Sequence, residues 1–260
     1  MFTNPMGETR TTIPSPRRHA AYALAFAALC AALVTAVAIP IADASKARVI
    51  GHTKHTPRPA CPDKKHPGRC RAIGRVTGFM KVADGKKHPF RVQRDGKLVA
   101  WAVDVSRPSK DQRNVFGELF ENKPFGKQPT GRIAVLKHKE KQSYKLLHQS
   151  PTVELGGVLG RKEIFTLDKP LTVRKGNVVA FTSPTWTPNF QQRHLSDTGD
   201  RWRASRKKDN CQPKNGTDRA KRRFVRNSHA QQNVGSVRDY ECLYTHGRIL
   251  YWAYYVPNRK

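Results

Sequence analysis

The sequence predicts an all-β protein: an antiparallel β-sandwich or jelly roll with a short helical insert, preceded by an N-terminal signal helix. Three observations predict this class. Short apolar runs with strand periodicity recur at roughly 8–15-residue spacing from Arg71 to the end of the chain. Gly, Pro and Asp turns separate these runs. No repeated strand–helix–strand pattern indicates a parallel sheet.

The first element of the chain is an export signal. Arg10, Arg17 and Arg18 precede an unbroken apolar run over residues 20–42, which ends in the small-residue pattern Ala42-Asp43-Ala44 behind a proline. This is the layout of a secretory signal peptide, so we expect residues 1–44 to be removed and the protein to be secreted or held at the extracellular cell surface. The 23 apolar residues are also long enough to span a bilayer, so an uncleaved membrane anchor is the alternative.

The next segment, residues 45–70, contains few apolar residues and many Lys, His, Pro and Gly. This composition predicts a basic, flexible arm. Residues 71–260 then form the β-sandwich domain, which is long enough to bury a core of its own. Within this domain, residues 191–242 are poor in apolar side chains and are predicted as a long basic excursion tied by a disulfide.

The clearest strand of the domain is residues 97–105, KLVAWAVDV. Both of its faces are apolar, which predicts a central, buried strand. Asp95-Gly96 just before it predicts a tight hairpin with residues 90–92. In residues 106–130, Ser109 is positioned to cap a short helix. The apolar stripe of that helix would be Val115, Phe116, Leu119 and Phe120.

Strands resume around residues 133–136 and 144–148, joined by a charged turn, and again around residues 164–167. In residues 171–183, a strand, a Lys-Gly turn and a second strand predict a hairpin, because Gly supplies the positive φ that such turns need. The C-terminal run 249–256 is apolar on both faces, so it must pair inside the domain.

Four cysteines follow the signal segment: Cys61, Cys70, Cys211 and Cys242. An even count in an exported chain predicts two disulfides. Of the three ways to pair them, we favour Cys61–Cys70, which closes a short loop, and Cys211–Cys242, which closes a loop of about 30 residues. A four-cysteine zinc site is the alternative, but the sequence contains no Cys-x-x-Cys pair, so we expect no metal site.

Charge is the second strong signal. The chain contains 49 Lys and Arg against 19 Asp and Glu, a net charge of +30, and almost all of it follows the signal segment. Such a field favours association with polyanions, and the extracellular candidates are anionic wall polymers, acidic polysaccharide, extracellular DNA and anionic lipid. A charge that only keeps the protein soluble is the alternative. Residues 20–42 would enter a membrane only if the signal stays uncleaved.

The densest basic stretch is residues 201–226, which contains eleven Lys and Arg against two Asp, with Trp202 and Phe224 among them. Cations for phosphate or sulfate and rings for stacking are what a polyanion site needs. The alternative is a solvated loop pinned by the disulfide. The candidate polyanion-binding residues are Arg201, Arg203, Arg206, Lys207, Lys208, Lys221, Arg222 and Arg223.

The segment SPTWTPNF, residues 183–190, places Trp186 and Phe190 in a proline-stiffened loop after a strand. Exposed rings in such a loop can stack on the apolar faces of sugars, which makes these two residues the candidate glycan-stacking pair. The alternative, which we favour, is that Trp186 covers one end of the sandwich core.

The sequence shows no catalytic motif: no Gly-x-Ser-x-Gly elbow, no His-Glu-x-x-His and no P-loop. Glu154, Glu163 and Asp168 are candidates for a glycosidase carboxylate pair, but sequence spacing cannot place two of them across a cleft. We therefore lean towards a protein that is not an enzyme, and we expect no cofactor.

Three runs carry a resemblance to a known group: PFRVQRDGKLVAWAVDVSRPS, GRIAVLKHKEKQSYKLLHQSPTVEL and FTLDKPLTVRKGNVVAFTSPTWTP. With the signal segment and the cysteine pair near the mature start, the chain resembles uncharacterised secreted actinobacterial proteins across roughly residues 61–256. The resemblance implies a jelly-roll-like β-sandwich and implies no activity. This chain departs from the group in its richness in Lys and Arg, so a ligand common to the whole group does not follow.

Taken together, these patterns predict an exported, non-enzymatic β-sandwich that contacts anionic polymer through residues 201–226. A carbohydrate-binding module that uses Trp186 is the first alternative, and a secreted hydrolase is the second.

Overall fold

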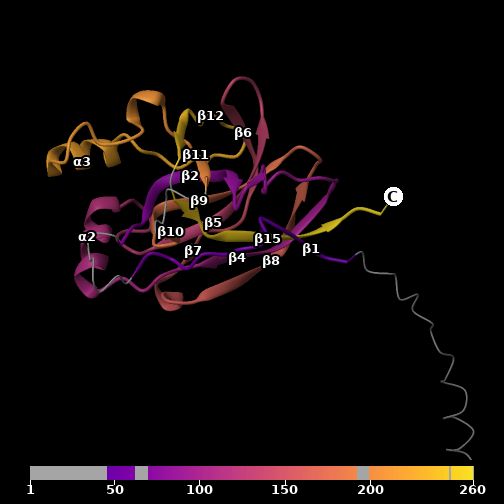
Figure 1. Ribbon diagram of the computed structural model, residues 1–260, viewed down its shortest axis with the longest axis horizontal. Helices are drawn as coiled ribbons and strands as arrows, with labels where there is room; N and C mark the ends of the chain where they lie inside the picture. The colour runs from indigo at the N-terminus through magenta and orange to yellow at the C-terminus, as the bar shows by residue number, and fades with distance from the viewer. Residues whose placement is uncertain (1–45, 62–69, 192–198, 246, 260) are drawn as a thin grey trace, which may run out of the picture. The chain divides into compact units, whose positions relative to one another are not determined.

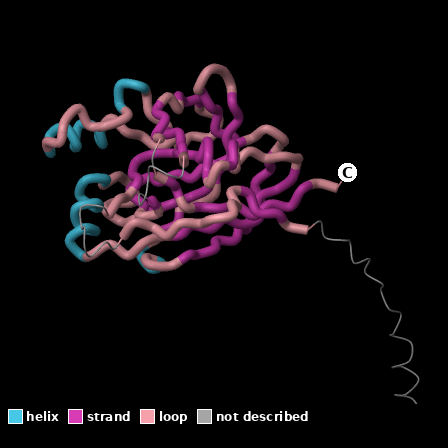
Figure 2. The backbone as a smooth tube through the Cα atoms, viewed as in Figure 1, coloured by secondary structure: helices cyan, strands magenta, loops and turns pink. Residues whose placement is uncertain are grey.

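A computed structural model describes residues 46–61, 70–191, 199–245 and 247–259. These residues form two main antiparallel sheets, with two short α-helices beside them (Figure 1, Figure 2). The all-β antiparallel sandwich expected from the sequence is confirmed. The predicted signal segment lies outside the described residues, and none of the helices within them is long and apolar enough to cross a membrane.

The smaller sheet has the strand order β1-β15-β4-β8. β4 (Gly96–Asp104) lies between β15 (Tyr251–Pro257) and β8 (Lys162–Val173), and β1 (Arg48–Ile50) pairs with the other edge of β15. The sequence-based prediction of a central, buried strand is therefore confirmed, and the apolar C-terminal strand pairs inside the domain as expected.

The larger sheet has nine strands, and its main path runs β12-β6-β5-β9-β2-β11-β13. β3 pairs with β2 and β7 pairs with β5, while β10 and β14 form a separate ladder. The strand bounds are β2 (Ile73–Ala83), β3 (Lys86–Lys87), β5 (Thr130–His138), β6 (Ser143–Gln149), β7 (Val153–Glu154), β9 (Val178–Thr187), β10 (Phe190–Gln191), β11 (Arg201–Ala204), β12 (Val237–Asp239), β13 (Cys242–Tyr244) and β14 (Arg248–Ile249). The helices are α2 (Lys110–Phe120) and α3 (Asp218–Arg226), with 3-10 turns η2 (Gly156–Val158) and η3 (Lys208–Asn210).

The main core lies between the two sheets. Trp101 on β4 and Tyr251 on β15 face Phe181 on β9, with ring centroids 6.0 Å and 5.7 Å from the Phe181 ring. Strand side chains alternate between the two faces of a sheet, so the apolar residues of one face meet those of the opposite sheet. Burying one large apolar side chain stabilises a fold by roughly 1.5–3 kcal/mol, so this shared core holds the sheets together.

Residues around Gln231 and Tyr240 pack on the face of the larger sheet that lies away from the main core. Gln231 connects this segment to the sheet: its backbone N–H donates to Thr77 Oγ1 (3.0 Å) and its side-chain amide donates to the Tyr144 carbonyl (3.1 Å). The Tyr240 hydroxyl in turn donates to Gln231 Oε1 (2.8 Å). A satisfied buried polar network specifies one position for a segment. Much of the predicted excursion 191–242 is therefore part of the sheet or of its cover.

Two predicted hairpins are wrong, because their strands lie in different sheets. Residues 90–92 make one isolated bridge, from Arg91 to Val178 on β9, whereas β4 pairs with β8 and β15. The turn at Gly176, with φ +89°, joins β8 of the smaller sheet to β9 of the larger one. A turn between apolar strands has the same local pattern whether it closes a hairpin or crosses between sheets. The predicted charged turn lies between β5 and β6, which pair with each other as a hairpin.

The arm predicted over residues 45–70 is folded onto the domain in its described part, residues 46–61. In addition to the β1–β15 pairing, the Arg248 guanidinium donates to the carbonyl of His55 (3.0 Å) and to Thr53 Oγ1 (2.6 Å). The backbone N–H of Ala60 donates to the Phe190 carbonyl (3.0 Å). The prediction of flexibility was wrong here because composition does not reveal a free strand edge that needs a partner.

The helix predicted after Ser109 is confirmed as α2. The Ser109 hydroxyl accepts the backbone N–H of Gln112 (3.2 Å), and the Gln112 side chain accepts the backbone N–H of Ser109 (2.9 Å), which is a capping box. Phe116 and Phe120 pack inward as expected, but Val115 is 59% exposed, so the apolar stripe is narrower than the sequence indicates.

Candidate anion-binding site

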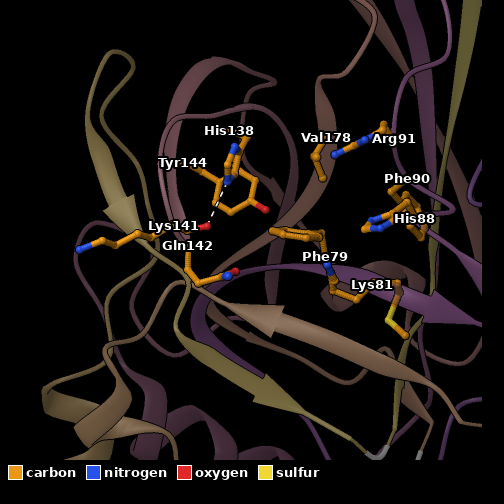
Figure 3. Close-up of a pocket in the computed structure, with 11 residues that line it drawn as sticks. Phe79, Lys81, His88, Phe90, Arg91, His138, Lys141, Gln142, Tyr144 and Val178 are labelled. Carbon is orange, nitrogen blue, oxygen red and sulfur yellow. Dashed lines mark hydrogen bonds between the residues drawn. The ribbon is translucent and has the colours of Figure 1, made fainter.

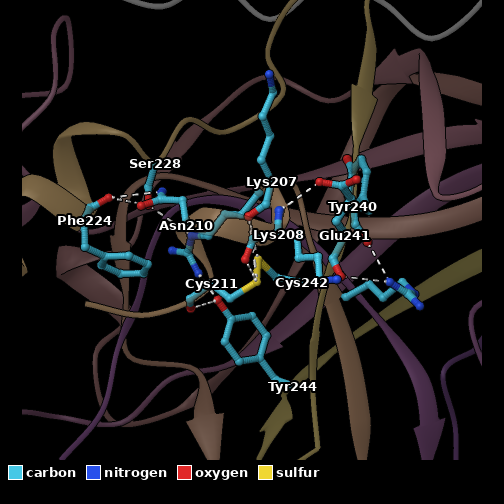
Figure 4. Close-up of a disulfide and its surroundings, with 12 residues drawn as sticks. Lys207, Lys208, Asn210, Cys211, Phe224, Ser228, Tyr240, Glu241, Cys242 and Tyr244 are labelled. Carbon is cyan, nitrogen blue, oxygen red and sulfur yellow. Dashed lines mark hydrogen bonds between the residues drawn. A yellow bond between two sulfur atoms is a disulfide. The ribbon is translucent and has the colours of Figure 1, made fainter. Parts of the chain in front are cut away.

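The predicted basic stretch is tied to the larger sheet by a disulfide between Cys211 and Cys242 (Figure 4). This bond and the Cys61–Cys70 disulfide confirm both expected pairings. The Tyr244 hydroxyl donates to the Cys211 carbonyl, which joins the two ends of the loop a second time. Two disulfides are typical of proteins that fold in an oxidising, extracellular environment.

β11 presents its two predicted cations on the side away from the core. Trp202 and Ala204 belong to the core, so strand alternation turns Arg201 and Arg203 outward. Arg201 is exposed, whereas Arg203 is half-buried and its Nη1 donates to the carbonyls of Tyr240 (2.8 Å) and Glu241 (3.2 Å). Burial lowers the pKa of the Arg203 guanidinium. Arg203 is therefore fixed by the backbone, and Arg201 extends into solvent.

Arg206 does not fit the predicted role of polymer contact, because it is only 7% exposed. Its Nε donates to Ser228 Oγ (3.1 Å), its Nη1 to the Tyr244 hydroxyl (3.0 Å) and its Nη2 to the Gly74 carbonyl (3.0 Å). The guanidinium carbon also lies 4.6 Å from the Phe224 ring centroid. All three nitrogens bind inside the protein, so Arg206 is a structural cation that joins β2, β13 and the end of α3.

The remaining predicted cations are exposed. Lys207 and Lys208 flank the start of η3, and the Lys208 backbone N–H donates to the carboxylate of Glu241 (2.8 Å; Figure 4). Lys221, Arg222 and Arg223 lie on α3. Of the eight candidate residues, Arg203 and Arg206 are held by hydrogen bonds inside the protein, and the other six are exposed. The sequence alone could not separate these two groups.

α3 is held against the domain by its apolar side. Phe224 and Val225 pack in one cluster with Trp186, and the Thr217 hydroxyl accepts the backbone N–H of Ala220 (3.3 Å) as an N-cap. A helix of nine residues is too short to be stable in isolation. These contacts and the nearby disulfide therefore determine where α3 lies.

Four arginines share the solvent-facing side of α3. Arg219, Arg222, Arg223 and Arg226 are all exposed and follow the i, i+3, i+4, i+7 spacing of one helix face, opposite the apolar contacts. We call these four residues the arginine stripe. Lys221 lies at its flank, with its Nζ 3.1 Å from Asp218 Oδ1. The sequence analysis missed Arg219 and Arg226, although their helical spacing was available as a signal.

The arginine stripe carries unrelieved repulsion. Its members form like-charge pairs at i+3 and i+4, and each such pair destabilises a helix by roughly 0.2–0.5 kcal/mol, which amounts to about 1–2 kcal/mol for the stripe. Arg223 and Arg226 lie in the last turn, where the helix dipole favours cations. The packing of α3 outweighs this repulsion, and a bound anion would relieve it.

The predicted glycan-stacking pair is buried. Trp186 is 1% exposed, donates from Nε1 to the Lys127 carbonyl (2.8 Å) and packs against Phe116 with ring centroids 5.3 Å apart. A pocket of about 410 Å³ beside α2 has Trp186 among its lining residues. Phe190 pairs with Ile249 in the β10–β14 ladder and is also buried. Neither ring presents a face to solvent, so the alternative that Trp186 covers the end of the core fits the structure.

The carboxylates considered for hydrolysis lie on different sheets. Glu163 and Asp168 are on β8 of the smaller sheet, and Glu163 forms an ion pair with Arg161 (2.9 Å). Glu154 is on β7 of the larger sheet and is exposed. Within the described ranges, no group of three or more His, Cys, Asp or Glu is placed to hold a metal ion.

A second concentration of cations lines a pocket of about 140 Å³ that the sequence analysis did not anticipate (Figure 3). The pocket lies between the β2–β3 and β5–β6 hairpins, and Lys81, His88, Arg91, His138 and Lys141 contribute to its walls. Lys81, His88 and Arg91 come from one stretch of the chain, and His138 and Lys141 come from a distant one. No local sequence signal could therefore bring the two groups together.

Comparison with known proteins adds no relative: no family model, no curated protein and no solved structure matches the chain.

Proposed function

We propose that this protein is exported and binds anionic polymers outside the cell, with the arginine stripe as its principal contact. The observation that carries the proposal is the presence of four exposed arginines on one face of a helix whose other face is anchored to the domain. Export rests on the signal pattern of residues 1–44 and is supported by the two disulfides.

The dimensions of the stripe suit a polymer with closely spaced charges. Arg219 and Arg226 are seven residues apart, which at a helical rise of about 1.5 Å per residue makes the stripe roughly 10 Å long. A nucleic-acid strand carries one phosphate per roughly 3.4 Å of duplex axis, so the stripe spans about three phosphates. Anionic wall polymers and acidic polysaccharide share this chemistry of repeated anions on a flexible chain, and extracellular DNA does so as well.

The arginine side chain is suited to this contact. Its planar guanidinium binds two oxygens of a phosphate or sulfate at once, and it is more weakly hydrated than a lysine ammonium. Because counterions are released when such a polymer binds, affinity should fall steeply with salt. Lys221 should contribute less, since its ammonium already pairs with Asp218.

The test is a salt titration of binding. The purified protein is titrated against labelled heparin, single-stranded DNA and poly(glycerol phosphate), with anisotropy as the readout. The stripe variant carries Arg219→Gln, Arg222→Gln, Arg223→Gln and Arg226→Gln. Each lost contact should reduce the slope of log affinity against log salt by roughly 0.7–0.9, so the stripe variant should lose about three units of slope.

A matched control removes the same charge elsewhere. It carries Lys97→Gln, Lys169→Gln, Arg174→Gln and Lys175→Gln, at exposed positions of the smaller sheet and the turn after it. Both variants have the same net charge, so net charge alone would weaken binding equally. The proposal is wrong if the wild-type protein ignores all three polymers at low salt, or if the control loses as much slope as the stripe variant.

A further inference from the structure

We propose that the pocket between the β2–β3 and β5–β6 hairpins binds a single tetrahedral oxyanion, namely the phosphate or sulfate group of an ester. This site is separate from the arginine stripe. The inference goes beyond polymer binding by α3, and it stands or falls independently of it.

The backbone of the β2–β3 hairpin brings three basic side chains together. Asp84 and Gly85 adopt φ values of +51° and +72°, as a tight hairpin turn requires. After the hairpin, the backbone N–H of His88 donates to the Lys81 carbonyl (2.8 Å), and the N–H of Arg91 donates to the His88 carbonyl (3.0 Å). Lys81, His88 and Arg91 are therefore held side by side by main-chain hydrogen bonds rather than by flexible side-chain contacts.

The other wall and the floor are aromatic and apolar. Phe79 on β2 and Tyr144 on β6 make an edge-to-face pair with centroids 5.1 Å apart, and Val178 on β9 lies between these strands in the sheet. Figure 3 shows Tyr144 and His138 on one side of Phe79, with His88 and Arg91 on the other. Phe79 is 2% exposed, so this wall is part of the core and is already formed before any ligand arrives.

The cations of the pocket have no anionic neighbour among its lining residues. Burial lowers the pKa of the Lys81 ammonium, and the charges of Arg203 and Arg91 lower it further. Burial also lowers the pKa of His88, and the charges of nearby Lys and Arg side chains lower it further. None of the described residues that line the pocket is acidic. A bound anion would supply the missing opposite charge in a partly desolvated place, where such an interaction is stronger than in water.

The size and the donors of the pocket indicate the class of ligand. A volume of about 140 Å³ is below the range of roughly 300–1,000 Å³ that holds drug-sized molecules, so one anionic group and its first attached atoms fit. The Lys81 ammonium, the Arg91 fork and the His88 ring offer donors from several directions. Burial raises the pKa of Tyr144, so its hydroxyl also remains a donor at neutral pH. Three free oxygens of a phosphate or sulfate ester match such donors better than the two oxygens of a planar carboxylate.

The test measures small-anion binding by chemical-shift titration of the whole protein. The probes are inorganic phosphate, inorganic sulfate, glycerol phosphate and, as the planar comparison, acetate. We expect phosphate, sulfate and glycerol phosphate to bind at millimolar concentration or below, and acetate to bind at least several-fold more weakly. A higher affinity for phosphate than for sulfate would indicate a phosphate ester as the ligand. The reverse order would indicate a sulfate ester.

Two variants and two controls locate the site. Arg91→Gln and His88→Gln change exposed side chains. Loss of the charge-assisted Arg91 donor should weaken binding roughly ten-fold. His88→Gln should weaken binding most at low pH, where the ring carries its charge. Lys139→Gln removes the same charge from an exposed position of the β5–β6 turn that does not line the pocket, and should change affinity less than two-fold. The stripe variant of α3 should bind small anions as the wild type does.

The pH dependence uses sulfate, because phosphate and its esters gain a proton within the range of the titration, at about pH 6 for an ester. Affinity for sulfate should rise as the pH falls from 8 towards 5, since His88 gains its charge in this range, and His88→Gln should flatten the rise. The charged or titratable groups that surround His88 are Lys81, Lys87 and Arg91 on its own side and His138 and Tyr144 across the pocket.

The proposal is overturned if none of the tetrahedral anions shifts resonances of the pocket at millimolar concentration. It is also overturned if acetate binds as tightly as sulfate, or if Lys139→Gln weakens binding as much as Arg91→Gln. If small anions bind but the stripe variant still binds polymers normally, the pocket stands and the proposed role of α3 fails.

Discussion

Replacing Arg206 with alanine should destabilise the protein by about 3–5 kcal/mol while leaving the polymer contacts of α3 in place. The substitution removes three hydrogen bonds from a cation that is 7% exposed. The Gly74 carbonyl and the Ser228 hydroxyl stay buried, and each buried group left without a partner costs roughly 1–3 kcal/mol. Ser228 still donates to the Phe224 carbonyl (2.8 Å) and accepts from Asn210 Nδ2 (3.4 Å), so most of the cost falls on the Gly74 carbonyl.

Two further contributions nearly offset each other. The guanidinium lies over the Phe224 ring, and a partly desolvated contact of this kind stabilises by about 1–2 kcal/mol. Alanine also removes the cost of burying a charge that no carboxylate compensates. A net loss of about 3–5 kcal/mol is a large part of the 5–15 kcal/mol that a domain typically has.

The assay is urea unfolding followed by tryptophan fluorescence, since the chain contains 4 Trp. Arg201→Ala is the matched control, because Arg201 is an exposed arginine only five positions before Arg206. Its loss should change the free energy of unfolding by less than about 0.5 kcal/mol. Arg206→Lys keeps the charge but not the planar fork, so its loss should be intermediate.

The reasoning is refuted if Arg206→Ala costs no more than Arg201→Ala. It is also refuted if the folded Arg206→Ala protein, measured at low temperature, loses as much polymer affinity as the stripe variant. The second outcome would return Arg206 to the set of polymer contacts.

Three other outcomes follow from the structure. Replacing Cys211 and Cys242 with serine opens a loop with a sequence separation of 31, which should cost about 3–4 kcal/mol in urea unfolding; an unchanged midpoint would contradict this. Trp186→Ala should cost roughly 3–5 kcal/mol and leave the retention of the protein on neutral glycan columns unchanged, because the ring is core; retention that depends on Trp186 would contradict its burial. Burial, and then the nearby cations Arg75 and Arg238, lower the pKa of His229 from 6.5, so the unfolded chain binds more protons below that pH. The free energy of unfolding should therefore fall as the pH drops below about 6.5, and His229→Gln should reduce the fall.

Features that depend on neighbouring residues were predictable. The alternation of side chains predicted an antiparallel all-β fold, and the buried strand at Gly96–Asp104 confirms it. Ser109 predicted the start of α2, because a cap acts within three residues. Loop length favoured the disulfide pairs, since cysteines close in sequence meet with little loss of entropy.

Features that depend on distant residues were not predictable. A turn such as that at Gly176 does not reveal which sheet the next strand joins, and so two hairpins were assigned wrongly. Composition cannot separate the buried Arg206 from the exposed Arg201, because the difference lies in the groups that surround each guanidinium.

The sequence by itself determined the class of fold, the number of disulfides and the large positive charge, because the periodicity of apolar residues, the even number of cysteines and the composition are properties of the chain. Only the tertiary structure decided where that charge can act. The arginine stripe needed a helix with one side anchored, and the pocket at His88 needed two hairpins brought together across β9. The selection of strand partners is non-local, and it is this selection that converts scattered cations into sites.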